Sequence, residues 1–121
     1  IDESAPSKHF SILVEKLPRR HSSLLFQLRT GHAPLNKHLH CIMKVPSPIC
    51  QQCHRREETV HHFLLACPKY TRQRLSLQNE IGPQASHLKN LLNDQKCVKP
   101  LLRYIASTHR LEQIFGDVTP P

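Results

Sequence analysis

Four positions in the middle of the chain carry side chains with the chemistry of metal ligands. Cys50 and Cys53 are separated by two residues, the spacing at which a tight turn directs two thiolates at one tetrahedral centre. Cys67 and either His61 or His62 complete the set, and with His62 the pattern is Cys-x2-Cys-x8-His-x4-Cys. Three thiolates and an imidazole favour zinc over oxygen-seeking ions, and four protein ligands leave no open position for water. These residues predict one structural Zn²⁺.

The spacing does not decide between the two histidines. At about 100° per residue of an α-helix, Cys67 lies about 120° around the axis from His61 and about 140° from His62. Pro68 disturbs the helix at this point, because the residue before a proline is disfavoured in helical geometry. Both histidines therefore stay open as the fourth ligand on helical phase alone.

Other interpretations of the cysteines are weaker. Cys50 and Cys53 could be plain loop thiols and Cys67 a buried helix residue, but a loop of this composition has little else to hold it together. A redox Cys-x2-Cys motif needs a strand before it and a helix after it, and Pro48-Ile49 supplies neither. With five Cys and no secretion signal, a disulfide framework is also disfavoured.

The remaining candidate groups point to no second site and no catalysis. His38, His40 and Cys41 occupy helical positions that point apart, Cys97 is expected to be a small buried hydrophobe, and His32 follows a helix-ending glycine. The acidic pairs Asp2-Glu3 and Glu57-Glu58 are sequence neighbours, not a spaced acid and base, and no glycine-rich loop is present. This fragment is predicted to be non-catalytic and to have no small-molecule substrate.

The elements that must position the cysteines are helices. Ten Pro and three Gly separate segments whose apolar residues recur at helical spacing, which predicts an all-α fold, a small helical domain stapled by one zinc loop. The expected helices cover Ser7 to Leu17, Pro18 to Thr30, Pro34 to Ile42, Thr59 to Cys67, Lys69 to Ile81, Ser86 to Asn93 and Lys99 to Thr108. Lys44 to Glu58 is expected to be a loop, and the chain after Phe115 is expected to be frayed.

The 121 residues fit a single domain. We divide it into a helical part (1–45), a zinc-binding segment (46–74), C-terminal helices (75–115) and a tail (116–121). No apolar run is long enough to span a membrane, and the chain begins with Ile, so we expect a piece of a longer intracellular polypeptide.

Positive charge suggests a nucleic-acid partner. The net charge of +8 divides into +4 over residues 1–49, +3 over 50–74 and +1 over 75–121. A basic surface attracts phosphates, whereas the alternative is an ordinary solvated helix face. The candidate contacts with RNA or DNA are Arg19, Arg20, Arg29, Arg55, Arg56, Lys69, Arg72 and Arg74.

Several short words of the sequence together resemble one family. They are Leu28-Arg29-Thr30-Gly31-His32, Pro34-Leu35-Asn36 with Leu39, Ser47-Pro48-x-Cys50-x2-Cys53, and Glu58-Thr59-Val60-x-His62-Phe63-Leu64-Leu65-x-Cys67-Pro68. In this order they resemble the C-terminal cysteine and histidine domain of non-LTR (LINE-type) retrotransposon polyproteins, particularly the fungal kind in which it follows reverse transcriptase and ribonuclease H domains. The resemblance is strong from Leu17 to Arg74 and weaker to Arg110.

The resemblance implies a ligand set, a role and a location. The ligands would be Cys50, Cys53, His62 and Cys67, since the family's His precedes a Phe-Leu-Leu run. The domain would be a nuclear nucleic-acid-binding accessory to target-primed reverse transcription, within a parent RNA-directed DNA polymerase. The rival interpretation is a scaffold whose leucine-rich helices dock on the upstream domains of the same polyprotein.

Two departures from known patterns limit what the resemblance implies. Eight residues separate Cys53 from His62, where retroviral-type knuckles have four, so the base-stacking mode of those knuckles is not carried over. Cys41 stands where the family leads us to expect a basic or polar residue.

Overall fold

A computed structural model of the chain describes Glu15 and residues 17–120, and the first predicted helix, Ser7 to Leu17, lies outside the described residues except for Glu15 and Leu17. The elements are α2 (Arg19–Thr30), α3 (Asn36–Cys41), the π-helix η1 (His62–Ala66), the 3-10 helix η2 (Pro68–Tyr70), α4 (Thr71–Ile81), the 3-10 helix η3 (Gly82–Ser86), α5 (Leu88–Asn93), α6 (Gln95–Thr108) and α7 (Glu112–Phe115). The described part of the chain contains no β-strand beyond one isolated bridge, which confirms the all-α prediction.

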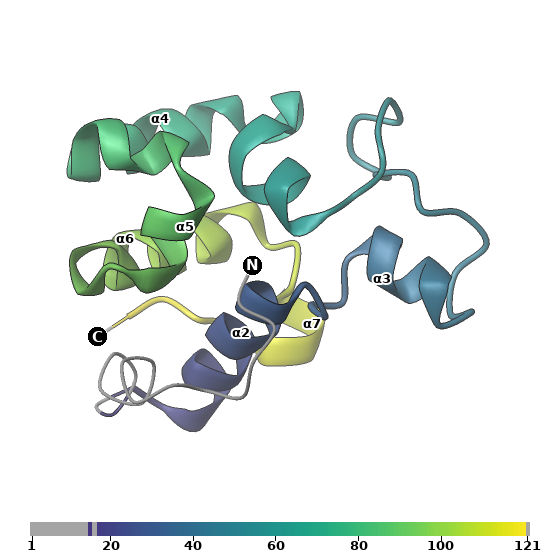
Figure 1. Ribbon diagram of the computed structural model, residues 1–121, viewed down its shortest axis with the longest axis horizontal. Helices are drawn as coiled ribbons and strands as arrows, with labels where there is room; N and C mark the ends of the chain where they lie inside the picture. The colour runs from purple at the N-terminus through teal and green to yellow at the C-terminus, as the bar shows by residue number, and fades with distance from the viewer. Residues whose placement is uncertain (1–14, 16, 121) are drawn as a thin grey trace.

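The C-terminal helices form a layered body, and the metal-binding segment connects it to α3 (Figure 1). Helix α4 lies across α6, α5 packs on α6, and α2 contacts both α5 and α7. Helix α3 stands to one side, and the chain between α3 and α4 runs through the candidate metal centre. The centre therefore lies between a large helical body and one small peripheral helix.

Aliphatic residues at helical spacing hold the body together. The predicted stripes of α2, α4, α5 and α6 face the core, and most of their members are buried: Leu24, Leu25, Leu28, Leu77, Leu91, Leu92, Leu101, Leu102 and Ile105. The predicted members Ile81 and Leu88 are only partly buried against it. Helix α2 ends at Gly31, whose φ of 81° is the left-handed conformation predicted for a glycine cap.

Three details differ from the sequence-based expectations. Helix α6 begins at Gln95, not Lys99, because Asp94 caps it by accepting a 2.9 Å hydrogen bond from the Lys96 N–H. Helix α3 ends at Cys41, so Ile42 lies beyond the helix and is 47% exposed instead of buried. The residues after Phe115 are not frayed as far as the structure describes them, because Val118 is buried among the core side chains.

Candidate metal centre

The first two cysteines are presented by a miniature hairpin. Ile49 and Glu57 form an antiparallel bridge, and inside it the Cys50 N–H donates to the Arg56 carbonyl at 2.8 Å. The turn closes when His54, with a φ of 58°, donates its N–H to the Cys50 carbonyl at 2.9 Å. This left-handed residue reverses the chain immediately after Cys53, which leaves both sulfurs on the inside of the turn.

The other two ligands come from a helical turn of unusual pitch. Thr59 caps its start, accepting a 3.0 Å hydrogen bond from the His62 N–H as predicted. At its end the Cys67 N–H donates to the His62 carbonyl at 2.8 Å, the five-residue hydrogen bond of a π-helix. This bond brings residues five apart onto one face of the helix. His62 and Cys67, about 140° apart in an ideal α-helix, therefore point to the same centre.

The four side chains meet at one point. The ligand atoms of Cys50, Cys53, His62 and Cys67 all lie within 4.8 Å of one another, close enough to hold one metal ion. The Cys50 and Cys67 sulfurs are 3.9 Å apart, and the Cys53 sulfur lies 3.4 Å from His62 Nε2. His61 is exposed and is not in the group. The geometry thus selects His62, the alternative that helical phase left open.

Each sulfur also faces a backbone N–H group. Gln52 N lies 3.4 Å from the Cys50 sulfur, and the N–H groups of Arg55 and Arg56 lower the pKa of Cys53 against the opposing effect of its burial. Burial raises the pKa of Cys67 to about 12, although the Lys69 N–H opposes the shift. The lowered pKa of Cys53 favours the thiolate that a metal requires, whereas burial favours the neutral thiol of Cys67 when no metal is bound.

The imidazole of His62 is held in the interior of the protein. Burial lowers its pKa, which favours the neutral ring that can bind a metal. Nε2 faces the sulfurs, and Nδ1 is buried without a hydrogen-bond partner in the part of the chain that the structure describes.

An ion pair between buried Glu58 and half-buried Arg110, absent from the sequence-based prediction, ties the hairpin to α3 and to the segment after α6. The Glu58 carboxylate accepts from Arg110 Nη2 at 2.5 Å and Nε at 2.8 Å, and one of its oxygens lies 4.0 Å from the Cys50 sulfur. It also accepts from the Asn36 N–H at 2.8 Å, at the first turn of α3. Glu58 thus joins the metal hairpin, α3 and the segment after α6.

A second buried network supports the helical turn of residues 60–67, the helical arm of the metal centre. Arg74 donates to the Cys67 carbonyl and, at 3.4 Å, to the Tyr104 hydroxyl. Tyr104 donates in turn to the Phe63 carbonyl at 2.6 Å. These bonds satisfy carbonyls around the π-helix, where a regular α-helical pattern is missing.

Two of the eight predicted nucleic-acid contacts are corrected by burial. Arg74 is 8% exposed and serves the network just described. Arg29 is 5% exposed and donates to the Leu92 carbonyl and to the Asn93 side chain. Both guanidiniums are committed to contacts inside the protein, so neither belongs to a phosphate-binding surface.

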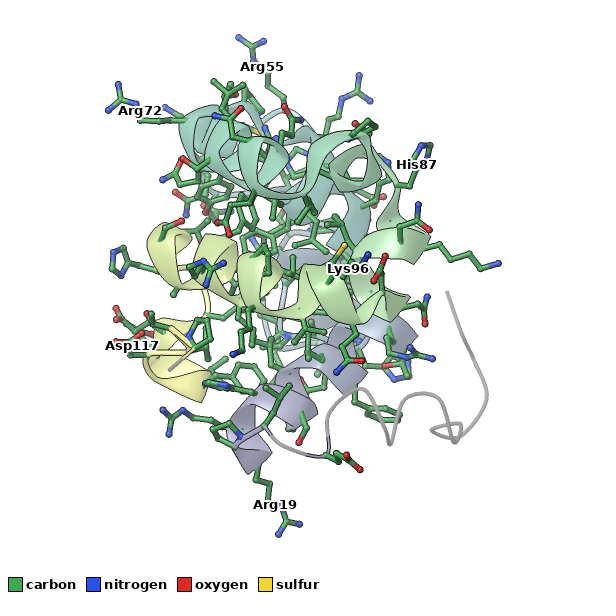
Figure 2. All side chains as sticks on the ribbon, turned by 90° about the vertical axis from the view of Figure 1, so that its left-hand side faces the viewer. Arg19, Arg55, Arg72, His87, Lys96 and Asp117 are labelled. Atoms are coloured by element: carbon green, nitrogen blue, oxygen red, sulfur yellow. The ribbon has the colours of Figure 1, made fainter. Side chains whose placement is uncertain are left out.

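The six other predicted contacts are exposed but divide between two ends of the molecule. Figure 2 shows Arg55 and Arg72 at the end formed by the metal segment and α4, with Arg19 at the opposite end. Arg56 and Lys69 are near Arg55 and Arg72 in sequence and form a first group with them, and Arg20 forms a second group with Arg19. Only the first group surrounds the metal centre.

The remaining sequence candidates stay outside the centre. His38, His40 and Cys41 form no metal group within the described residues, and the predicted burial of Cys97 is confirmed. No helix in residues 17–120 is both long and apolar enough to cross a membrane.

Comparison with protein-family models, curated proteins and solved structures finds no match to this chain.

Proposed function

We propose that the chain is a zinc-stapled helical module that binds nucleic acid at the end of the molecule that holds the metal. The observation that supports zinc is the spacing of the ligand atoms. A tetrahedral ion with Zn–S distances of about 2.3 Å and a Zn–N distance of about 2.0 Å places two sulfurs about 3.8 Å apart, and a sulfur and nitrogen about 3.5 Å apart. The corresponding distances are 3.9 Å and 3.4 Å.

The role of the ion is structural. Three thiolates and one imidazole fill the four positions of tetrahedral zinc, which leaves none for a reacting water. Zinc supplies a cross-link between the hairpin and the helical arm, and this fragment carries out no catalysis. The chain's own residues orient the ligands: His54 reverses the hairpin, and Thr59 caps the arm.

The exposed cations around the centre support the nucleic-acid partner. Four of them are exposed: Arg55 and Arg56 lie in the hairpin, and Lys69 and Arg72 follow the last candidate ligand, Cys67, in η2 and α4. Such a cluster binds phosphates with little sequence selectivity, because phosphate contacts position a strand without reading its bases. The parent protein, on the resemblance of the sequence, would be a nuclear retrotransposon polymerase acting on RNA and DNA.

Metal analysis of histidine variants tests the zinc site. We expect one zinc per chain in native protein, retained in His61→Ala and lost in His62→Ala. His61 is the matched control because it is the neighbouring, exposed imidazole. Zinc loss in His61→Ala with retention in His62→Ala would overturn the ligand set.

Salt-dependent binding tests the nucleic-acid surface. We expect Arg55→Gln with Arg72→Gln to weaken binding to unrelated sequences and to reduce the slope of log affinity against log salt by up to about two units on a duplex. Arg19→Gln with Arg20→Gln removes the same charge at the opposite end, and this control should bind like the parent. Equal losses in both double variants would show that net charge, not this surface, governs binding.

Exposed apolar side chains favour a second candidate, a scaffold that docks on the upstream domains. Met43 is 92% exposed beside Ile42, in the turn after α3. If the folded parent shows no affinity for RNA or DNA even at low salt, docking through this turn becomes the better account. Met43→Ser with Ile42→Ser should then weaken association with those domains.

A further inference from the structure

A groove between α4 and α6 continues the basic surface away from the metal centre. Its volume is about 390 Å³, and Arg72, one of the proposed phosphate contacts, stands on its wall. Leu77 and Pro100 line it but are almost wholly buried, and Ser76 and Ser107 add hydroxyl groups. A concave site with hydroxyls and a cation suits one unit of a sugar–phosphate chain.

The groove also contains an ion pair with no role in the core. Arg103 on α6 donates through Nε at 3.3 Å and through Nη2 to the carboxylate of Glu80 on α4. The two side chains are 45% and 38% exposed, so solvent and ligands reach them. A pair this exposed contributes little to stability. Glu80 is the acidic residue among the groove-lining side chains.

We propose that this groove binds one nucleotide of a single-stranded nucleic acid, with a phosphate between Arg72 and Arg103. The inference rests on the proposed function and extends it to a strand type and a new residue, Arg103. Glu80 competes with the phosphate for the Arg103 guanidinium. Binding exchanges that carboxylate for a phosphate oxygen on the same donors.

The concave shape of the groove favours a single strand over a duplex. Bases within a duplex are stacked and paired, so a duplex offers a side groove little besides its phosphates. An unpaired strand can place a sugar or base in the groove, beside Ser76 and Ser107, while its phosphate reaches the arginines. No sequence pattern indicates this site, because Arg103 and Glu80 lie in the part of the chain with almost no net charge.

Opposite charge changes in the same ion pair give the test. Binding of the full chain to fluorescein-labelled oligothymidylate and oligouridylate, and to a duplex of equal length, is measured by anisotropy across a salt series. We expect Arg103→Gln to weaken single-strand binding roughly two- to fivefold, the size of one exposed charge contact, and to reduce the salt slope by about 0.7. Glu80→Gln should strengthen it by a similar factor. Duplex binding should change less in both variants.

Both substitutions break the same ion pair, so a purely structural role predicts affinity changes of the same sign. Arg19→Gln, at the other end of the molecule, is the charge-matched control for Arg103→Gln. If the parent binds single strands but Arg103→Gln and Glu80→Gln bind no differently from this control, the groove assignment is wrong and the proposed function stands. If the parent binds neither strand type at low salt, both proposals fail.

Discussion

The metal-binding segment and the C-terminal helices achieve order by different means. In residues 46–58 most side chains are exposed, and the two buried ones, Cys50 and Glu58, are a candidate ligand and a buried acid. In α4 to α6 the buried side chains are mainly aliphatic, as in Leu101, Leu102 and Ile105. One region depends on a few strong local interactions, and the other on many weak ones.

This difference predicts different responses to damage. Apolar packing is distributed, so the loss of one side chain removes only its own burial and leaves a cavity. In a metal cluster the stabilising interactions are concentrated in the few ligands and their hydrogen-bond partners, so the loss of one ligand removes the link among all of them. We therefore expect large, local effects in residues 46–70 and moderate, global effects in the helical body.

Metal removal should give the largest effect. A structural zinc contributes an apparent binding free energy on the order of 10 kcal/mol, comparable to the whole stability of a small domain. Chelation should abolish hydrogen-exchange protection from Pro46 to Tyr70 while α6 keeps more of its own. For contrast, Leu101→Ala should cost about 2–5 kcal/mol and lower the melting temperature of the whole domain without loss of metal. Unchanged exchange in the metal-free protein would show that the helices alone hold the segment.

The ion pair between Glu58 and Arg110 should rank next. Arg110→Met leaves the Glu58 carboxylate buried and unpaired, a loss of about 3–5 kcal/mol, whereas Glu58→Gln leaves a guanidinium that is 19% exposed and should cost less. Chemical denaturation of Glu58→Gln, Arg110→Met and the double variant measures it, and the double variant should lose less than the sum. The exposed pair of Arg103 and Glu80 is the matched control, with an expected loss of about 0–1 kcal/mol. Additive losses at Glu58 and Arg110 would show that the two side chains act separately.

The sequence was most informative where a local rule suffices. Leucine spacing predicted the buried faces of α2 and α6, Gly31 predicted the end of α2, and Thr59 predicted the start of the helical arm. The four candidate ligands were also predictable as a group, because their residue types and spacing are uncommon without a metal.

The sequence was least informative where segments far apart in the chain meet. Glu58 and Arg110 are 52 residues apart, and adjacent Glu57 and Glu58 look alike in sequence although one is exposed and the other buried. The resemblance implied His62, but helical phase at 100° per residue did not, because it does not anticipate the π-helix. Arg74 was predicted to be an exposed nucleic-acid contact, because the sequence does not show that it bonds to Tyr104 on another helix.

A buried histidine in the helical body should produce a smaller, pH-dependent effect. Both ring nitrogens of His21 are buried without a hydrogen-bond partner among the described residues. Burial and then the neighbouring Arg20 lower its pKa from the usual 6.5, while Asp117 opposes the shift. The unfolded chain therefore takes up the proton more readily, and stability should fall as the pH drops below about 6.5 toward the lowered pKa of the folded state.

Thermal melts across this pH range measure the contribution of His21. His21→Leu should flatten the pH dependence, whereas His87→Gln, a change at an exposed histidine (Figure 2), should keep it. An unaltered pH dependence in His21→Leu would assign the effect to other groups.

The smallest effect should come from two histidines in the same backbone conformation, one in each region. His54 in the metal hairpin and His109 after α6 both have a φ of 58°, where a residue with a Cβ is strained and glycine is not. His54→Gly and His109→Gly should each add up to about 1 kcal/mol to the free energy of unfolding, because relief of strain is partly offset by the greater entropy of the unfolded chain.

The variants should differ in metal release. His54→Gly should slow zinc transfer to a chelator, because His54 closes the turn around Cys50 and Cys53, and His109→Gly should leave the transfer rate unchanged. His54→Ala removes the same imidazole but keeps the strain, so it should not share the gain. If alanine stabilises the hairpin as much as glycine does, the gain comes from loss of the histidine ring and the backbone explanation is wrong.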